Sequence, residues 1–380
     1  PNREAKTSFL MNTLDRFRRG AQFVNGLFTE FWVNGLLSNP ISHARNILSM
    51  SLQTLWMPNE RFLVATLDFG KDRAVFFSEA AAAYRGIWTG LRRGVELAGK
   101  RVRGEPVFGS EKAAEMPKAW TAENFGLPNE SLAGSTIDYL GMAIRTPGSA
   151  MAVEDAFFKG TLFQMELEAQ IAREIAKRTL AGSEAVALAN AWRQTPPASV
   201  QMTAETMALV KTFNAELGPL GQKFLEMANT VPGARLIFPF IRTPANILKQ
   251  VSYITPGLNV LTMGQDLLPS NGMLRSKLLA DLSVGGEQRA YALARLATSA
   301  VVAAAIVELS GAGWVMGDKP RITGKGPRDP KLARDWKAMG LQPYHIYPEG
   351  AVGEAEGFAY ASGTEPFGTS LAVLASYTEI

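Results

Sequence analysis

The chain has 380 residues, of which 47% are hydrophobic and 19% are charged, with no cysteine and a formal net charge of +4. The lack of cysteine excludes a disulfide framework, thiol catalysis and thiolate metal sites. The charged fraction is below the roughly 25% of ordinary globular domains. Together with 35 Gly, 20 Phe and 14 Met, it predicts much surface that is covered by other subunits or by a lipid or envelope environment.

Positive charge is concentrated in the first third of the chain. Residues 1–110 hold 15 Lys and Arg against 9 Asp and Glu, whereas residues 111–380 hold 24 against 26. The densest stretch, Tyr84–Gly104, also contains Trp88 and is the candidate contact for nucleic acid or anionic lipid. A solvated helix face is the simpler alternative. The six cations of this stretch are Arg85, Arg92, Arg93, Lys100, Arg101 and Arg103.

Helical spacing of apolar residues dominates the first half and predicts a mainly α fold. The strongest single pattern is Ala152–Gly182, where Gly182 is expected to stop the helix. The Gly- and Pro-containing stretch Lys100–Pro117 predicts a loop or hinge and is the first candidate boundary. The helical segments expected around it are Leu10–Leu37, Ile41–Trp56, one or two helices in Arg61–Ala98, and Ser135–Ala181.

The second half alternates shorter helices with loops. A linker at Gln194–Val200 and the clearest surface loop at Gly317–Pro330 separate them, and short strands are expected only within Leu341–Gly363. The expected helices are Ser183–Arg193, Thr203–Asn229 with a break at Gly218–Pro219, a segment ending near Tyr253, and Gly286–Leu309. We expect a multi-helix, elongated or bundled architecture with a small irregular, β-containing C-terminal region.

These boundaries divide the chain into four predicted regions. They are a basic helical region at 1–110, a central helical region at 111–200, a second helical region at 201–317 and a loop-rich region at 318–380. Because the sequence opens without Met and closes within an apparent helix, we expect a fragment, a processed product or the ordered part of a longer polypeptide.

Three turns carry the residues of a helix start. Asn39–Pro40, Thr146–Pro147 and Thr243–Pro244 each place a good N-cap before a proline, whose missing N–H would be unpaired in the first turn anyway. The last two belong to a repeated Ile-Arg-Thr-Pro, a recurrence expected by chance in a chain of this length. All three turns therefore predict helix starts, and this structural interpretation requires no function.

Side chains suited to catalysis or metal binding are sparse. The two histidines, His43 and His345, lie far apart in the sequence, and no metal-ligand cluster, phosphate-binding loop or hydrolase elbow occurs. His43 lies one helical turn before Asn46, which favours a structural hydrogen bond over a proton relay. Carboxylates such as Glu166 and Glu168 are interpreted as solvated. We expect no cofactor, no metal and no enzymatic activity in this segment.

An uncharged run at Leu296–Val307 is the one candidate for membrane contact. It is shorter than the roughly 20 residues of a spanning helix, unless Glu308 is tolerated and the run continues to Met316. Packing inside a helical assembly is the preferred interpretation, and conditional insertion is the alternative.

Three sequence blocks resemble a known group of proteins. "FWVNGLLSNPISHARNILSM", "FPFIRTPANILKQ" and the pair "DWKAMGLQPYHIYPEG" and "GFAYASGTEPFGTSLAVLASYTE" are similar, in the same order, to helical segments of the internal virion (ejection) proteins and large polyvalent proteins of tailed, podovirus-like phages. His345 and Glu365 depart from the Ser and Asp usual there. The residues of the first two blocks that we expect to serve assembly are Asn39, Pro40, His43, Asn46, Phe238, Phe240, Arg242, Thr243, Pro244 and Asn246.

This resemblance implies a structural virion protein inside the capsid or portal region that helps to form an oligomeric conduit across the host envelope during genome ejection. It implies partners among copies of the same chain and other internal virion or portal proteins, with phage DNA and the host membrane as further candidates. The alternatives are a membrane-inserting envelope-active protein and a helical portion of a larger virion enzyme. In "FPFIRTPANI", Phe-Pro-Phe is expected to present an aromatic wedge, with Asn246 and Arg242 tying the turn to a neighbouring segment.

Overall fold

A computed structural model describes residues 3–68, 74–108, 118–231, 233–256, 286–315, 322–347, 357–361 and 363–378. The described chain is mainly α-helical with one two-stranded sheet, which confirms the predicted fold class. Parts of two predicted loops, at 109–117 and 317–321, lie outside the described residues.

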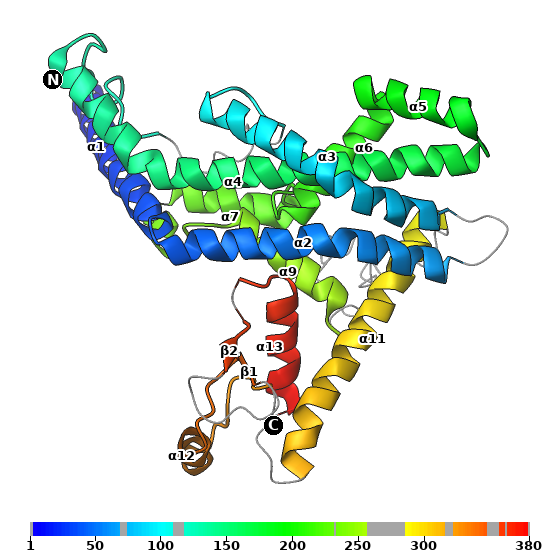
Figure 1. The fold of residues 1–380 in the computed structure, drawn as a ribbon. Helices are drawn as coiled ribbons and strands as arrows, with labels where there is room; N and C mark the ends of the chain where they lie inside the picture. Colours follow the sequence, from blue (N-terminus) through cyan, green and yellow to red (C-terminus); the bar gives the residue numbers. More distant parts are fainter. Residues whose placement is uncertain are drawn as a thin grey trace.

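Six helices lie in the described part of the first half of the chain (Figure 1). Several of them begin or end away from the predicted bounds, and α2 continues beyond Trp56 and through Pro58. The helices are α1 (Arg3–Leu37), α2 (Pro40–Leu67), α3 (Phe77–Val102), α4 (Leu132–Lys177), α5 (Gly182–Gln194) and α6 (Ala198–Lys211).

The second half has shorter helices and the small sheet. Its strands, β1 (His345–Ile346) and β2 (Phe358–Ala359), pair antiparallel with His345 opposite Ala359, within the segment where strands were expected. The helices are α7 (Pro219–Thr230), α8 (Ala234–Ile237), α9 (Arg242–Ile254), α11 (Gly286–Val315), α12 (Pro330–Ala338) and α13 (Phe367–Thr378).

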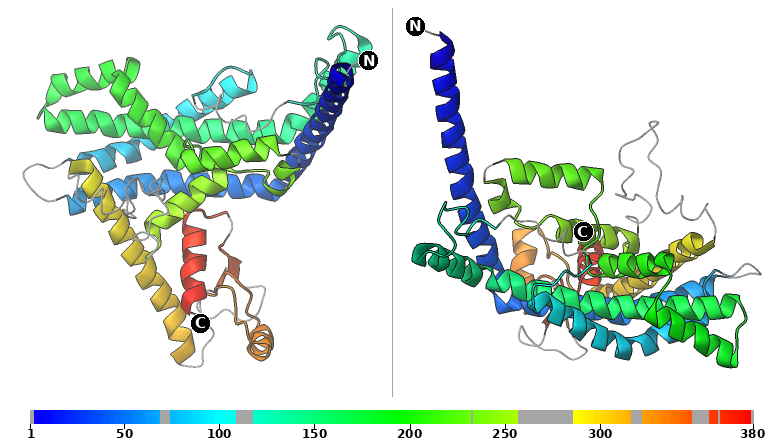
Figure 2. Two further views of the ribbon diagram at one scale, coloured as in Figure 1. Left: turned by 180° about the vertical axis from the view of Figure 1, so that it is seen from behind. Right: turned by 90° about the horizontal axis from the view of Figure 1, so that it is seen from above.

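The long helices α2, α3 and α4 run side by side as a layer, with α5 and α6 at one end (Figure 1). The views from behind and above show α1 extending away from this layer, while α11, α13, α12 and the sheet lie on one side of it (Figure 2). Helices of the predicted first region pack directly on those of the second. The division into four regions nevertheless stays a prediction.

Small residues allow α3 and α4 to approach closely. A Cβ atom built on Gly94 would lie 2.5 Å from the Phe157 carbonyl oxygen, and one on Gly90 would lie 2.7 Å from that of Thr161. A side chain at either position would have to displace backbone, so this interface tolerates only glycine without adjustment.

A buried ion network joins the three helices of the layer. Arg61 of α2 donates to Glu79 of α3 at 2.6 Å and to Glu166 of α4, while Arg173 of α4 donates to both Glu79 oxygens at 3.0 and 2.8 Å. Burial lowers the pKa of Arg61, but Glu166 and then Tyr291 and Glu79 raise it more, so the net direction is upward. The two guanidiniums and two carboxylates cancel in charge, which makes their burial tolerable.

The interpretation of Glu166 and Glu168 as solvated is therefore wrong. Glu166 is 0% exposed and Glu168 is 8% exposed. Glu168 accepts both donors of Arg193, at 2.8 and 2.7 Å. Each carboxylate is desolvated only because an arginine distant in sequence meets it, and no local pattern marks such a partner.

The first Ile-Arg-Thr-Pro does not start a helix. Pro147 lies inside α4, and the N–H of the next residue, Gly148, donates to the side chain of Asn34 on α1 at 3.3 Å. Arg145 of the same turn pairs with Glu30 of α1 at 2.8 Å. The proline removes one rung of the helix ladder, and α1 supplies the polar groups beside the gap.

Two further boundary predictions can be compared with the structure. Asn39 caps α2 as expected, accepting the Ile41 N–H at 2.9 Å with Pro40 next. Gly182 was expected to end a helix, but α4 ends at Lys177 and Gly182 begins α5 with a φ of 56°. Thr179, with a φ of 52°, makes the left-handed turn that follows α4.

Candidate functional site

The first sequence block binds α2 to α4 through one carboxylate. His43 Nδ1 lies 2.6 Å from Glu154 Oε1, its Nε2 lies 2.9 Å from the Leu37 carbonyl, and Asn46 donates to Glu154 Oε2 at 3.0 Å. A carbonyl only accepts, so Nε2 carries a proton. His43 and Asn46 therefore hold the start of α2 against the middle of α4, in agreement with a structural role for the pair.

Asp155, next to Glu154, extends this contact to the turn after α6. It accepts from Asn46 at 3.5 Å and from Asn214 at 3.3 Å. Burial raises the pKa of Asp155, and the charge of Lys159 opposes that shift. Burial likewise lowers the pKa of Lys159, against the attraction of Asp155. The attraction between Asp155 and Lys159 thus offsets part of the effect of burial on the pKa of each group.

The second block meets the same turn. The Asn246 side chain donates to the carbonyls of Phe213, Ala215 and Arg242, at 3.1, 2.9 and 3.1 Å. Phe213 has a φ of 56°, a left-handed conformation that is uncommon for a bulky residue. Its side chain is 1% exposed and packs with Met50, Phe158 and Ile247, and this packing holds the residue in that conformation.

Residues about 200 positions apart are thereby brought to one place. Asn46 reaches Asn214 through Asp155, and Asn246 holds the residues on either side of Asn214. We call this arrangement of Glu154, Asp155 and residues 212–215, with the side chains that bind them, the motif junction. These hydrogen bonds all position helices.

The expected cap at the second Ile-Arg-Thr-Pro is displaced by two residues. The N-cap position of α9 is Ile241, so Thr243 and Pro244 lie inside the first turn, and Thr243 is exposed. Asn246 ties this turn to the neighbouring segment through the carbonyls of Phe213 and Ala215, whereas the Arg242 carbonyl accepts from Asn246 within the turn itself. The helix begins earlier than predicted because Arg242 already has helical geometry. Pro244 is tolerated inside the first turn, because the N–H groups of that turn have no acceptor within the helix.

The aromatic wedge is only partly exposed. Phe238 is 42% exposed and its ring packs edge to face on Phe224 of α7, with centroids 5.1 Å apart. Phe240 is half-buried. Buried Arg235 fixes the Phe238–Phe240 segment, because it donates to the Asn229 side chain and to the Pro239 carbonyl.

The six cations of the basic stretch do not form one uniform stripe. Within α3 and its end, Arg93 and Lys100 share Glu96 at 2.7 and 3.2 Å, and Arg103 pairs with Glu105. Arg101 lies on the side of Lys159, whose pKa it lowers. Arg85 and Arg92 are exposed and make no ion pair within the described part of the chain.

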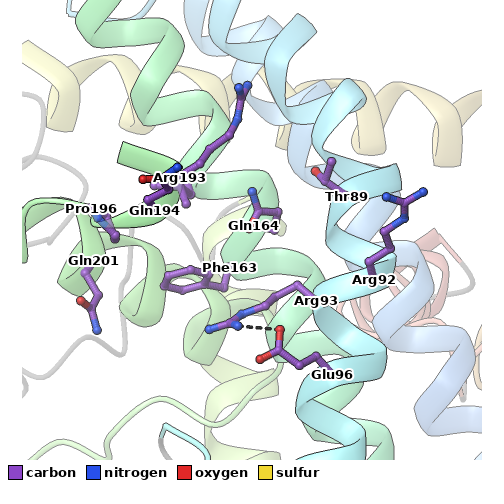
Figure 3. Close-up of a pocket in the computed structure, with 11 residues that line it drawn as sticks. Thr89, Arg92, Arg93, Glu96, Phe163, Gln164, Arg193, Gln194, Pro196 and Gln201 are labelled. Carbon is purple, nitrogen blue, oxygen red and sulfur yellow. Dashed lines mark hydrogen bonds and ion pairs between the residues drawn. The ribbon is translucent and has the colours of Figure 1, made fainter. Parts of the chain in front are cut away.

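A cavity of about 470 Å³ lies beside this stretch (Figure 3). Its wall on α3 is polar, and the opposite wall comes from α4, the end of α5 and the start of α6. We call it the basic pocket. Its lining residues are Thr89, Arg92, Arg93, Glu96, Phe163, Gln164, Leu167, Arg193, Gln194, Pro196 and Gln201. Arg193 was missed by the sequence analysis, because it lies about 100 residues from the basic stretch without neighbouring cations.

A second cavity, of about 530 Å³, lies where α2, α6, α9, α11 and the start of α13 meet. It is lined mostly by apolar and aromatic side chains around Glu60, Lys211 and Arg295. Lys211 donates to Glu60 at 2.5 Å. Burial raises the pKa of Glu60, but Lys211 and Arg295 lower it more, so it falls below 4.5. A carboxylate shifted in that direction is held charged and is not tuned for proton transfer near neutral pH.

The apolar run is part of α11. One helix among the described residues is long and apolar enough to cross a membrane, at Arg289–Ile306, and 33% of that window is buried. Ala294 and Ile306 are buried, whereas Val301 is 66% exposed. Packing inside this chain therefore covers the run only in part. Among the described residues, no group of three or more His, Asp or Glu is arranged to hold a metal ion.

Comparison of the chain with protein-family models, with curated proteins and with solved structures finds no match.

Proposed function

We propose that this chain is a non-enzymatic, structural protein of a tailed-phage particle. It is packaged in the capsid or portal region and takes part in genome ejection as one part of an oligomeric conduit across the host envelope. Its partners are other copies of itself and other internal virion or portal proteins.

The observation that carries the proposal is the motif junction. Two of the three blocks that resemble ejection proteins contribute side chains to it, and their polar groups bind backbone carbonyls and buried carboxylates of other helices. Such use of Asn46 and Asn246 fits a shared architecture more closely than a shared catalytic site. The exposed apolar side chains of α1, among them Val24, Phe28 and Phe31, fit a protein that assembles with others.

Mass spectrometry of purified particles tests this proposal. Particles of the phage that encodes the chain are expected to contain it in fixed copy number. After DNA release is triggered in vitro, the chain should leave the particles with the genome, and during infection it should enter the host envelope fraction. Particles without the polypeptide, or particles that keep it after release with no transfer to cells, would contradict the proposal.

A membrane-inserting envelope protein is the second candidate, and the exposure of α11 favours it. Two thirds of the apolar window Arg289–Ile306 is not buried by the chain itself. Flotation of the chain with liposomes, compared with a variant carrying Val301→Lys, decides this point. Flotation that is lost in the variant supports insertion of α11, whereas no lipid binding by the unaltered chain removes this candidate.

A further inference from the structure

We propose that the basic pocket, together with the exposed face of α3 beside it, binds the backbone of a single-stranded nucleic acid. This inference does not depend on the assignment to a phage particle, because it rests on the contacts and charges of α3 to α6 alone.

The charge of the pocket is positive and is balanced only in part. Arg93 is paired with Glu96, and Arg193 is paired with Glu168. Arg92 lines the pocket without an ion pair among the described residues. Arg85, two helical turns earlier on the same side of α3, is exposed in the same way. The site thus presents two guanidiniums whose charge no neighbouring carboxylate neutralises.

The remaining lining suits an anionic, hydrogen-bonding ligand. The side-chain amides of Gln194 and Gln201 add neutral donors to the guanidiniums. The volume of about 470 Å³ lies within the range of pockets that hold small ligands and cofactors. Figure 3 shows that these groups come from both walls, with Arg93 and Glu96 joined on the α3 side. A sugar-phosphate unit that enters would meet donors from several helices.

An aromatic surface lies directly beside these cations. Trp88 is 76% exposed and precedes Arg92 by one turn, and Tyr84, 44% exposed, precedes Trp88 by another turn. The Tyr84 hydroxyl donates to Asn59 at 2.7 Å, which fixes the ring in place. Exposed rings that alternate with arginines provide a stacking platform for unpaired bases. A duplex keeps its bases stacked inside, so its convex surface uses neither the rings nor the concave pocket.

An anionic membrane is the rival partner for such a helix. A helix that lies in a membrane interface buries a broad apolar face among the lipids. In α3 the face with Gly90 and Gly94 is already packed on α4, and Arg92 and Arg93 line a pocket between helices. The large aliphatic side chains exposed on α3 are Val95 and Val102, which do not make a broad apolar face. The observations therefore favour a flexible strand over a lipid surface.

Fluorescence anisotropy of the full chain with a labelled oligothymidylate of about 12 nucleotides tests the inference. The informative variants are Arg92→Ala and Trp88→Ala, since both side chains are exposed and their loss leaves no buried charge. Arg18→Ala and Tyr139→Ala, an exposed arginine on α1 and a 72% exposed aromatic residue on α4, are the matched controls. A duplex of equal length and phosphatidylglycerol vesicles serve as competitors.

Arg92→Ala is expected to weaken binding and to reduce the slope of log K against log salt by about 0.7, the value for one lost contact to a single strand. Trp88→Ala is expected to raise Kd at least about fivefold, from the loss of one stacked base. The controls should bind as the unaltered chain does, and duplex should compete poorly.

The inference is overturned if both variants bind like their controls, if duplex competes as well as single strand, or if only the vesicles bind. None of these results bears on whether the chain is present in virions, which the particle analysis measures separately. Failure of the one proposal is therefore distinguishable from failure of the other.

Discussion

His43 and Glu154 join α2 to α4, with His43 Nδ1 2.6 Å from Glu154 Oε1. The Nε2 proton of His43 is directed to the Leu37 carbonyl, so the 2.6 Å contact from Nδ1 to Glu154 requires a second proton on either the ring or the carboxyl group. The pair is thus either an imidazolium with a carboxylate or a neutral imidazole with a carboxylic acid. In both forms, removal of one member leaves a polar group of the other without its partner.

The first prediction concerns this pair. His43→Ala should lower the free energy of unfolding by about 1–3 kcal/mol, because Glu154 and the Leu37 carbonyl each lose a partner. Urea denaturation of His43→Ala, Glu154→Gln and the double variant measures the coupling. We expect the double variant to lose at least about 0.5 kcal/mol less than the sum of the single losses. Additive losses would show that the contact contributes nothing of its own.

The second prediction separates the two polar residues of the "RTPAN" turn. Asn246→Ala should cost about 1–3 kcal/mol, because the carbonyls of Phe213 and Ala215 lose a donor in a buried place. Thr243→Ala should change the free energy of unfolding by less than about 0.5 kcal/mol, as expected for an exposed residue that does not cap the helix. Thermal or urea unfolding checks both. Equal losses of stability for the two variants would indicate that Thr243 does cap α9.

The buried ion network gives the third prediction. Arg61→Met should destabilise the chain by about 3–5 kcal/mol, because Glu79 and Glu166 are left buried with too little positive charge. Arg178→Met, at an exposed pair with Glu174, should cost no more than about 1 kcal/mol. Chemical denaturation of both variants measures the contrast. A loss for Arg61→Met as small as that of the control would mean that the carboxylates find other partners.

The fourth prediction tests the close approach of α3 and α4. Gly94→Ala should destabilise the chain by about 1–3 kcal/mol, since its Cβ would overlap the backbone of Phe157. Gly20→Ala on α1 meets nothing within 4 Å and should stabilise its helix by about 0.5–1 kcal/mol. Thermal unfolding gives the sign of each change. Stabilisation by both substitutions would show that the two helices separate easily.

The fifth prediction follows from the lowered pKa of Glu60. Its folded-state pKa lies below its ordinary 4.5, so the unfolded chain binds more protons in the interval between the two values. The stabilising contribution of Glu60 is therefore fully present above pH 4.5 and is lost as the pH falls through the folded-state pKa. Glu60→Gln should be less stable than the unaltered chain at pH 6, and this difference should shrink at lower pH.

Urea titrations at a series of pH values between about 3 and 6 measure that difference. Glu130→Gln, which removes an exposed carboxylate, is the matched control for the loss of one negative charge. A stability difference for Glu60→Gln that stays constant across the series would contradict the prediction.

Local signals account for much of the fold. Apolar spacing predicts most helices, and the Asn39–Pro40 cap lies where the sequence places it, because capping depends on neighbouring residues only. Thr146–Pro147 carries the same kind of signal and fails. There the helix continues through the proline, and Asn34, more than 100 residues away, accepts the N–H of the residue after it.

The candidate sites were predictable only to the extent that their residues are adjacent in the chain. Arg92 and Arg93 stand out from composition, but Arg193 becomes part of the same pocket only because α3 and α5 both pack on α4. Glu166 looks like any carboxylate on a polar helix face until Arg61 meets it. Partners of this kind are fixed by tertiary structure, and a single sequence does not reveal them.

The glycine contact between α3 and α4 has a repeat of four residues, at Gly86, Gly90 and Gly94. Such a surface is nearly the same after α3 slides by one repeat, a shift of about 6 Å. The same shift would carry Glu79 out of reach of Arg61 and Arg173, and the buried Glu79 carboxylate would lose both guanidinium partners, whereas Arg61 would keep Glu166. The ion network therefore fixes the axial register of α3 on α4, because the repeating glycine contact by itself would allow more than one register.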